Sequence, residues 1–437
     1  MKRNVSFDTI VVVALVLYAW SVWAHFPYAG GHIYSDIVTV FQIRECGAAC
    51  VPPFPIPYVQ SFIEYPIGTA FFAYAMGVFA SFLPGQFLNT YYLLSCFFLS
   101  IPTLLLIREL RLITTLRGLK VSNIFWFLVA TPTFLFALLA NWYVIGACFT
   151  VAGLRFFTQG RTKTSGLLLG LSAATNLVTA VPALGLLLSA RRIRDAVAFA
   201  GVAVGSYLML NLPIYLLNPA NWLGFWRFQY NWYIEDSWML LFVGNESPLR
   251  HVIPEVLFAA FILVLLVLRF RFKTADPLVL SFICTFAFVF STYVYTPQMN
   301  VLLLPFFVVI PALASYPEFI VFDALNALVI VGFSTGLTDF FALFGVALTV
   351  GQWGLTSPIQ LAGIIRSFWV GKFAAYDGLY RKGVREKGEN KNMRDRPPVK
   401  TSRLPTEKDS RESYSSASSL EAGASAIPPE AEDPSTT

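Results

Sequence analysis

Charged residues are scarce in this sequence. Asp, Glu, Lys and Arg together make up 13% of its 437 residues, whereas hydrophobic residues make up 56% and aromatic residues 16%. An ordinary soluble domain carries about 25% charged residues, so the composition excludes that class. The mean hydropathy of +0.63 and the long runs of Leu, Val, Phe and Ala instead predict a protein that crosses a membrane many times.

The sequence also lacks the alternation of apolar and polar residues that marks the strands of a membrane β-barrel. Because a bilayer accepts only backbone whose hydrogen bonds are satisfied, the apolar runs are expected to be helices. The predicted fold class is therefore all-α, a polytopic helical bundle of about 11–13 spans.

Motifs of soluble enzymes are missing as well. We find no Gly-rich phosphate loop, no HExxH and no GxSxG, and only 5 cysteines. Cys46 and Cys50 share the first outer loop and are placed to form a small disulfide, whereas a CxxxC pair without nearby histidines is a weak metal site. We therefore predict no metal-binding residues and leave the cofactor unknown, with a divalent metal still open.

The positive charge has a topological explanation. A net charge of +6 suggests nucleic acid for a soluble protein, but here the cations lie between apolar runs, at 108–120, 161–163, 191–194 and 269–273. Such clusters mark the cytoplasmic side of a membrane protein. The first apolar run follows Lys2 and Arg3 and has no small-residue cleavage site, which predicts a retained signal anchor with a cytoplasmic N-terminus. No nucleic-acid partner is expected.

These clusters constrain the segments between them. Residues 64–83 are predicted to form an amphipathic or half-inserted helix on the outer surface, because a crossing there would place 108–120 outside. Residues 122–140 and 142–158 are predicted to cross outward and return. Residues 165–190 have basic residues at both ends, which predicts a hairpin of two short helices that turns near Asn176.

The chain divides into a membrane domain and a tail. Residues 1–376 are predicted to form the transmembrane domain, with 26–85 and 218–250 as extracytoplasmic loops that form an outer cap with a juxtamembrane helix. Residues 377–437 begin with many cations and continue rich in Ser, Glu and Pro without apolar periodicity, so they are predicted to be a disordered cytoplasmic tail.

The unusual polar residues collect on the predicted outer side. Asp36 follows the first apolar run closely and is held near the membrane boundary, where partial desolvation raises the basicity of a carboxylate, so it is our candidate general base. A helix N-cap or a solvated loop aspartate is the alternative. The candidate substrate-binding residues are Tyr34, Glu64, Tyr65, Asn141, Arg227, Glu235, Asp236 and Gln298.

Several of these polar residues also have a structural interpretation. Glu64 precedes a proline and suits the opening of a helix. Arg227 lies among aromatic residues, as a guanidinium that binds a lipid phosphate does, but it can also pair with Glu235 or Asp236. Gln298 can bind sugar or phosphate, or cap a helix. His251 is favoured as an anchor at the membrane boundary.

Five short motifs occur in an informative order. They are "YSDI" at 34–37, "EYPIG" at 64–68, "NWYVIG" at 141–146, "SGLLLGLSAATNLVTAVPAL" at 165–184 and "YTPQMNVLLLPF" at 295–306. In this order the chain, over residues 5–370, resembles the GT-C class of integral-membrane glycosyltransferases, and within it the polyprenyl-phosphate-mannose-dependent α-mannosyltransferases. "YSDI" is similar to the catalytic aspartate motif of that class, which assigns the base to Asp36.

The resemblance implies a GT-C-like bundle and an inverting transfer of a sugar, mannose first, from a polyprenyl-phosphate donor to a glycan, glycolipid or protein acceptor. The active site is expected outside the cytoplasm in a cell membrane, with both termini cytoplasmic. Two positions depart from the pattern: Tyr143 stands where an acid is usual and Asn176 where a lysine is usual. A catalytically inactive GT-C-like protein therefore remains an alternative. A membrane transporter or lipid flippase is another, because it would use the same kind of apolar bundle.

Overall fold

The computed structural model describes residues 5–27, 33–46, 52–190, 192–271, 276–335 and 345–354. These residues are helical and contain no named strand, in agreement with the predicted all-α class. They all belong to one compact unit, Met1–Gly378, and the second unit, Leu379–Thr437, lies outside the described residues together with the predicted tail over 377–437. The predicted pairing of Cys46 with Cys50 also falls partly outside them.

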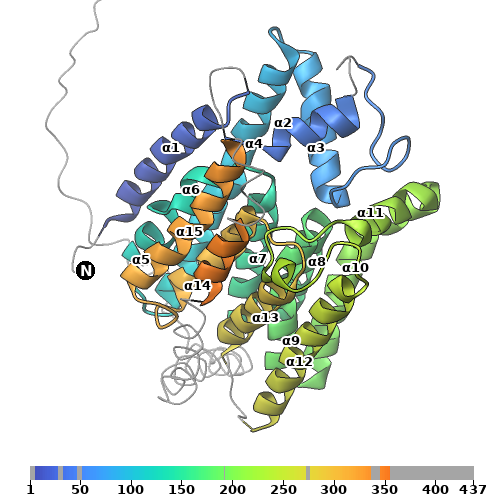
Figure 1. Cartoon of the computed structure of the whole chain (residues 1–437). Coiled ribbons are helices and arrows are strands. Elements are labelled where there is room, and N and C mark those ends of the chain that lie inside the picture. Colours follow the sequence, from blue (N-terminus) through green and yellow to red (C-terminus); the bar gives the residue numbers. More distant parts are fainter. Residues whose placement is uncertain are drawn as a thin grey trace, which may run out of the picture. The chain divides into compact units, whose positions relative to one another are not determined.

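The first half of the chain alternates long and broken helices (Figure 1). The elements are α1 (Phe7–Ala24), α2 (Asp36–Val40), a π-helical turn (Phe41–Cys46), α3 (Ile67–Ser81), α4 (Phe87–Leu116), α5 (Ser122–Ile124), a second π-helical turn (Phe125–Val129), α6 (Pro132–Phe136) and α7 (Tyr143–Thr158).

The second half continues in the same manner. Its elements are α8 (Thr162–Thr175), a 3₁₀ turn (Leu177–Ala180), α9 (Pro182–Ser189), α10 (Ile193–Leu217), α11 (Pro219–Asn231), a 3₁₀ turn (Trp238–Leu241), α12 (Leu249–Arg271), α13 (Pro277–Ser291), a 3₁₀ turn (Pro297–Met299), α14 (Asn300–Val309) and α15 (Tyr316–Ser334). Residues 345–354 form a further helical segment.

Within the described residues, five helices are long and apolar enough to cross a membrane: α1, α4, α10, the Leu249–Val267 part of α12, and α15. The shortest has 18 residues, which at a rise of about 1.5 Å per residue approaches the thickness of a hydrocarbon core. Exposed side chains on α12 include Val256 and Leu263, each about 60% exposed, and α10 exposes Val197 and Met209 to the same extent. Apolar surface of this size requires lipid, so the protein is an all-α membrane protein.

Contacts along the helices define two ends of the bundle. Near one end the guanidinium of Arg111 in α4 lies 4.1 Å from the ring of Phe7 in α1. Near the other end the hydroxyl of Tyr92 in α4 donates to the carbonyl of Val22 in α1, at 2.9 Å. The two helices therefore run antiparallel. We call the end that holds Arg111 the basic end.

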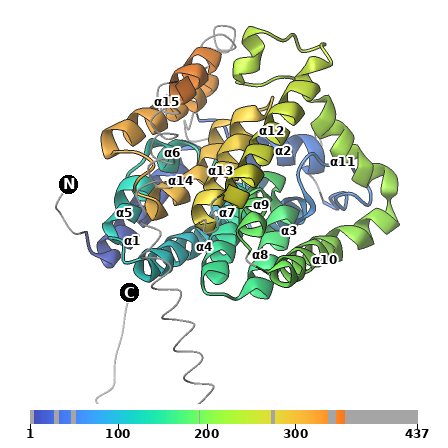
Figure 2. The same cartoon turned by 90° about the horizontal axis from the view of Figure 1, so that it is seen from below.

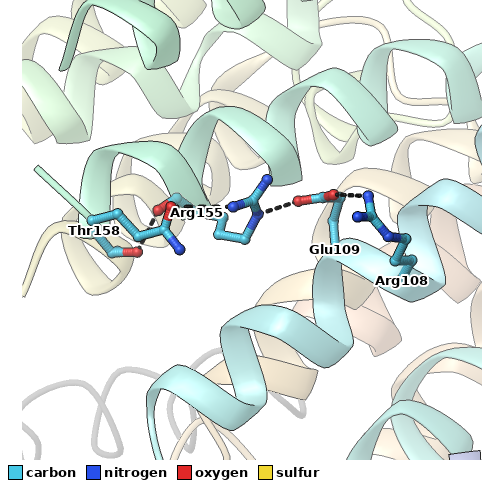
Figure 3. Close-up of polar contacts among 5 residues, drawn as sticks. Arg108, Glu109, Arg155 and Thr158 are labelled. Atoms are coloured by element: carbon cyan, nitrogen blue, oxygen red, sulfur yellow. Dashed lines mark hydrogen bonds and ion pairs between the residues drawn. The ribbon is translucent and has the colours of Figure 1, made fainter. Parts of the chain in front are cut away.

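The basic end is held by paired ions. Figure 3 shows the carboxylate of Glu109 in α4 between the guanidinium groups of Arg155 in α7 and of Arg108. The side chains of Glu109 and Arg155 are only 6% and 12% exposed. Arg117 similarly binds Asp276 before α13, with a shortest distance of 2.6 Å. These pairs fix α4, α7 and α13 to one another at this end.

The segment 122–140 is not the single outward span predicted from its hydropathy. It consists of α5, a π-helical turn and α6, with a break at Thr131. Pro132 cannot donate a backbone hydrogen bond and clashes with the preceding helical turn, so a helix cannot pass through it unbroken. Thr131 is extended and its hydroxyl caps α6 by accepting from the amide of Phe134, at 3.1 Å.

The segment 165–190 turns at Asn176, as predicted. The extended Asn176 ends α8, and its side-chain oxygen accepts from the amide of Val178 at the start of the next turn. α8 follows the end of α7 that holds Arg155, and the carbonyl of Leu188 in α9 accepts from Arg269 at the end of α12. The chain therefore enters and leaves this region at the basic end.

α8 lies between α7 and α10 (Figure 2). The contact with α10 is so close that a Cβ added at Gly166 would lie 2.5 Å from the carbonyl oxygen of Phe199, and one added at Gly170 would lie 2.2 Å from that of Ala203. Small residues permit such close approach of helices in a membrane. The turn at Asn176 is thus held at a fixed place between its neighbours.

Candidate functional site

A cavity of about 970 Å³ opens at the end of the bundle opposite the basic end. The first residue of α7, the first turns of α12 and the last residue of α13 line it, whereas the other ends of these helices lie at the basic end. Eight of the nine predicted site residues line this cavity: Tyr34, Asp36, Glu64, Tyr65, Arg227, Glu235, Asp236 and Gln298. Asn141 does not.

Asp36 is the first residue of α2 and is 8% exposed. Its Oδ2 accepts a short hydrogen bond from the hydroxyl of Tyr65. Burial raises the pKa of Asp36 to about 6, the hydroxyl groups of Tyr34 and Tyr65 and the nearby amide of Asn141 oppose this rise, and the charge of Glu64 adds to it. The carboxylate is therefore mostly ionised at neutral pH, but it is far more basic than an ordinary aspartate.

The backbone around Asp36 is anchored to the turn before α7. The amide of Asp36 donates to the carbonyl of Ala140 at 2.6 Å, and the hydroxyl of Ser35 donates to that of Leu139 at 2.7 Å. On the other side the amide of Tyr34 donates to the hydroxyl of Ser334 in α15, at 2.9 Å. These bonds hold the start of α2 in place, and the Asp36 side chain lines the cavity.

Asn141 acts behind the cavity wall. Its side-chain oxygen accepts from the amide of Tyr143 at 2.9 Å, which helps to start α7. The same side chain lies near enough to Asp36 to favour its charged form. Its predicted role as a residue that binds substrate directly finds no support in its position. Its position supports a role in placing Asp36 and Tyr143.

Glu64 lines the cavity but has a partner. Arg44, in the π-helical turn after α2, donates to Glu64 Oε2 from Nη2 at 2.8 Å and from Nε at 3.1 Å. The guanidinium of Arg44 also lies over the rings of Phe62 and Phe228. This pairing ties the turn after α2 to the segment before α3 and to α11. The Arg44 partner was not predicted from the sequence.

Glu235 is held by backbone and side chain. Its amide donates to the carbonyl of Tyr293 and its carbonyl accepts from the amide of Tyr295, at 3.1 and 2.9 Å. The indole of Trp232 donates to Glu235 Oε2 at 2.8 Å. Burial raises the pKa of Glu235 to about 7; the Trp232 hydrogen bond lowers it, and the charges of Asp236 and Asp36 raise it.

Asp236 differs from its neighbour. Its backbone has a φ of +46°, a conformation that a non-glycine residue rarely adopts. Its Oδ1 lies so near Gly345 that a Cβ added there would be 2.4 Å away. Burial raises the pKa of Asp236 to about 6. The two adjacent carboxyl groups therefore have different surroundings.

Arg227 and Gln298 line the cavity from two elements that are distant in the sequence. Arg227 in α11 is exposed, and no ion pair joins it to Glu235 or Asp236 within the described ranges. Gln298 lies in the 3₁₀ turn that precedes α14. His251 instead stacks on Tyr230 with ring centroids 4.0 Å apart.

Part of the cavity wall is apolar. α12 contributes Pro254 and Phe258, α13 contributes Phe288, and α15 contributes residues including Val329 and Phe333. The rings of Phe258 and Phe288 meet edge to face, with centroids 5.7 Å apart. The cavity thus combines ionisable groups with a hydrophobic wall built by apolar helices, of which α12 and α15 are long enough to cross a membrane.

Several lining residues were not among the predicted site residues: Tyr143, Asn176, Trp232 and Glu255. Tyr143 had been noted only as a departure from a motif, and Asn176 as a departure and as the turn of the hairpin. Among the described residues, no group of three or more His, Cys, Asp or Glu side chains is arranged to hold a metal ion.

A comparison with models of known protein families finds no match for this chain, and a search of characterised proteins finds no similar sequence. The function therefore has to be inferred from the cavity itself.

Proposed function

We propose that the protein is a glycosyltransferase that moves a sugar, mannose in the first instance, from a polyprenyl-phosphate donor to an acceptor hydroxyl, with Asp36 as the general base. The observation that carries this proposal is the buried carboxylate of Asp36 on the wall of a cavity of about 970 Å³. Buried, perturbed carboxyl groups in a large cavity are candidates for catalysis.

The mixed lining of the cavity suits an amphipathic donor. A polyprenyl chain requires an apolar surface that opens toward lipid, and α12, α13 and α15 supply one through Phe258, Phe288 and Phe333. A sugar requires hydrogen-bonding groups, which Asp36, Glu235 and Gln298 supply. One cavity can therefore hold the chain and the sugar of a single lipid-linked donor.

The transfer follows as a single displacement. The acceptor oxygen forms a bond to C1 of the sugar while the bond from C1 to the phosphate oxygen breaks, and the electron pair leaves with the phosphate. Asp36 takes the proton of the acceptor hydroxyl. A carboxylate with a pKa of about 6 is mostly available as a base at pH 7 and is a stronger base than an exposed aspartate.

The two departures from the family pattern lie together. Tyr143 and Asn176 both line the cavity, and they interact with each other. Exchange of an acid and a lysine for this neutral pair removes one charge of each sign, so neither residue leaves an unmatched buried charge. This arrangement supports an altered site rather than a lost one.

The two ends of the bundle support a membrane orientation. The arginine clusters gather at the basic end and the cavity lies at the other end. By the preference of cations for the cytoplasmic side, the cavity faces outward and the N-terminus faces the cytoplasm. Nucleotide sugars are absent outside, so a lipid carrier meets the need for a donor there.

Epitope tags tested for protease access examine this orientation. We expect tags at the N-terminus and within 112–119 to be protected in sealed cells, and a tag near Glu246 to be cleaved. Cleavage of both the N-terminal and the 112–119 tags would place the basic end outside and the cavity on the cytoplasmic side. Cleavage of the 112–119 tag alone would mean that residues 64–83 cross the membrane, and it would contradict the antiparallel packing of α1 against α4.

A transporter or lipid flippase is the second candidate, favoured by one observation. Asp323 and Asn326 are fully buried in the membrane-spanning α15. The Asp323 carboxylate accepts from the amide of Thr133 at 2.9 Å, while its second oxygen has no hydrogen-bond partner. Ionisable residues inside membrane spans often belong to transport pathways.

One assay separates these readings. Purified protein in lipid nanodiscs is given polyprenyl-phosphate [¹⁴C]mannose and a mixture of cell-envelope glycans, glycolipids and peptides. Transfer of label to an acceptor supports the enzyme. If a parallel assay with nucleotide sugars shows that only these are used, the proposed donor is contradicted. If protein in vesicles moves the labelled lipid between leaflets without transfer of sugar, the flippase is favoured. An inactive GT-C-like protein would show neither.

A further inference from the structure

The ionisable groups of the cavity present a problem for a phosphate. Among the described residues that line it, the acidic ones are Asp36, Glu64, Glu235, Asp236 and Glu255, and the only cation is Arg227. Glu64 is matched by Arg44, but the other acids have no ion-pair partner in the described part of the chain. A leaving phosphate gains negative charge, so the cavity needs a group that neutralises it.

We propose that Glu235 is the general acid of the reaction, which donates its proton to the phosphate oxygen as the sugar leaves. This inference rests on the proposed glycosyl transfer. When the bond from C1 to the phosphate oxygen breaks, that oxygen receives both the electron pair and the proton from Glu235, while Asp36 accepts the proton of the acceptor hydroxyl. Proton exchange with water then restores both carboxyl groups.

The geometry favours Glu235 over the other acids. Its backbone is fixed by the two bonds to Tyr293 and Tyr295, and Trp232 binds its Oε2, so Oε1 is left to carry the proton. Asp236 turns its carboxyl group toward Gly345, and Glu255 is exposed on α12. Apart from Asp36, Glu235 is the acidic residue among the described lining residues that combines a fixed backbone, partial burial and an oxygen without a hydrogen-bond partner.

The surroundings of Glu235 also keep it protonated in the useful range. The ionisable groups that interact with it are Asp236 beside it, Asp36 from α2, Tyr34, Tyr143 from α7 and Tyr233. None of these is a cation. Burial and the neighbouring carboxylates raise the pKa of Glu235 to about 7, against about 6 for Asp36. Near pH 6.5 Glu235 is mostly protonated while Asp36 is mostly ionised, as an acid and a base require.

The first test is the pH profile of kcat/KM for the wild-type protein with polyprenyl-phosphate mannose. Activity falls below pH 6 as Asp36 becomes protonated and falls above pH 7 as Glu235 loses its proton, which gives a bell-shaped profile. A profile that stays flat from pH 7 to pH 9 overturns the inference.

The second test is Glu235→Gln. Glutamine keeps an oxygen that accepts from Trp232, so the loop stays in place, but it cannot donate a proton. We expect a rate about 10²-fold lower at pH 6.5 and no decline at alkaline pH. Glu246→Gln changes an exposed carboxyl group of the same loop region outside the cavity and should keep the bell shape. Retention of the alkaline decline in Glu235→Gln overturns the inference.

The third test shifts the alkaline limb of the pH profile instead of abolishing it. Trp232→Phe deletes the hydrogen bond that favours ionised Glu235, so the pKa of Glu235 rises and the alkaline limb shifts upward by about one pH unit. A residue that only supports the loop would change the rate without shifting this limb. This variant also decides the matter if Glu235→Gln does not fold.

Failure of this inference is distinguishable from failure of the proposed function. A wild-type protein that transfers sugar while Glu235→Gln and Trp232→Phe keep its alkaline limb overturns only the role of Glu235. A wild-type protein that transfers no sugar from any polyprenyl phosphate, at any pH between 5 and 9, overturns both.

Discussion

The two ends of the bundle treat buried carboxyl groups in opposite ways. At the basic end Glu109 and Asp276 each bind a guanidinium, from Arg155 and Arg117. At the cavity end Asp36 and Glu235 receive hydrogen bonds from a phenol and an indole, which are neutral. A cation fixes a carboxylate in its charged form, whereas a neutral donor in a buried site leaves its pKa near the working pH. The first arrangement stabilises a fold and the second permits proton transfer.

The strongest way to break this contrast is Asp36→Asn. Asparagine keeps an oxygen for the hydroxyl of Tyr65 and nearly the same shape, but it cannot accept a proton. We expect normal amounts of folded protein and a loss of turnover of about 10²- to 10⁴-fold. Asp8→Asn, an exposed aspartate in α1, is the matched control and should transfer sugar normally. Turnover of Asp36→Asn near the wild-type rate would remove Asp36 from the chemistry.

Glu109→Gln tests the opposite end. It leaves the guanidinium of Arg155 without its carboxylate in a site where that side chain is 12% exposed, which should lower the free energy of unfolding by about 3 kcal/mol. Thermal unfolding in nanodiscs measures the loss. The double variant Glu109→Gln, Arg155→Gln should recover part of it, and the turnover per folded molecule should not change. A large loss of turnover with unchanged stability would contradict the division between the two ends.

Tyr65→Phe sharpens the contrast at the cavity end. Removal of the hydroxyl takes away a donor that favours ionised Asp36, so the pKa of Asp36 rises above about 6. The acid limb of the pH profile should move upward by about one unit, with less than about a tenfold loss of rate at pH 8. Tyr74→Phe in α3 is the control. An acid limb that does not move would show that Tyr65 does not tune Asp36.

Arg44→Gln should have the smallest effect. Arg44 pairs with Glu64, but its side chain is 34% exposed, so solvent already screens the interaction. We expect a loss of unfolding free energy below about 1 kcal/mol, measured as for Glu109→Gln. A loss as large as that of Glu109→Gln would mean that the segments after α2 and before α3 depend on this pair as strongly as α4 and α7 depend on theirs.

The sequence predicted which residues lie together in the cavity better than it predicted the contacts that hold them there. The parity of basic clusters placed Asp36, Glu64, Arg227, Glu235 and Gln298 on one side, and all of them line one cavity. That inference requires only that each residue be assigned to one or the other end of its neighbouring helices. The predicted number of about 11–13 spans is not tested by the five helices that meet the length and hydropathy criteria in the described residues.

The details depended on contacts between distant segments. Backbone hydrogen bonds to Tyr293 and Tyr295 fix Glu235, and the local sequence does not show the alternating pattern that would predict this pairing. Nothing in the sequence indicated that Arg44 pairs with Glu64, because the two residues lie in different segments of the chain. The break at Thr131 could have been inferred from Pro132, but the apolar run around it favoured a continuous span.

The close packing of α8 between α7 and α10 has a consequence for how the protein is synthesised. With 14 and 8 residues, α8 and α9 are about 21 and 12 Å long and cannot span the hydrocarbon core alone. Their partner α10 is made later, and its backbone is the surface that Gly166 and Gly170 require. We therefore expect this hairpin to settle in the membrane only after residues up to about 217 have left the ribosome. Thiol probes on Ser165→Cys in arrested nascent chains would show protection before α10 emerges if insertion does not wait for it.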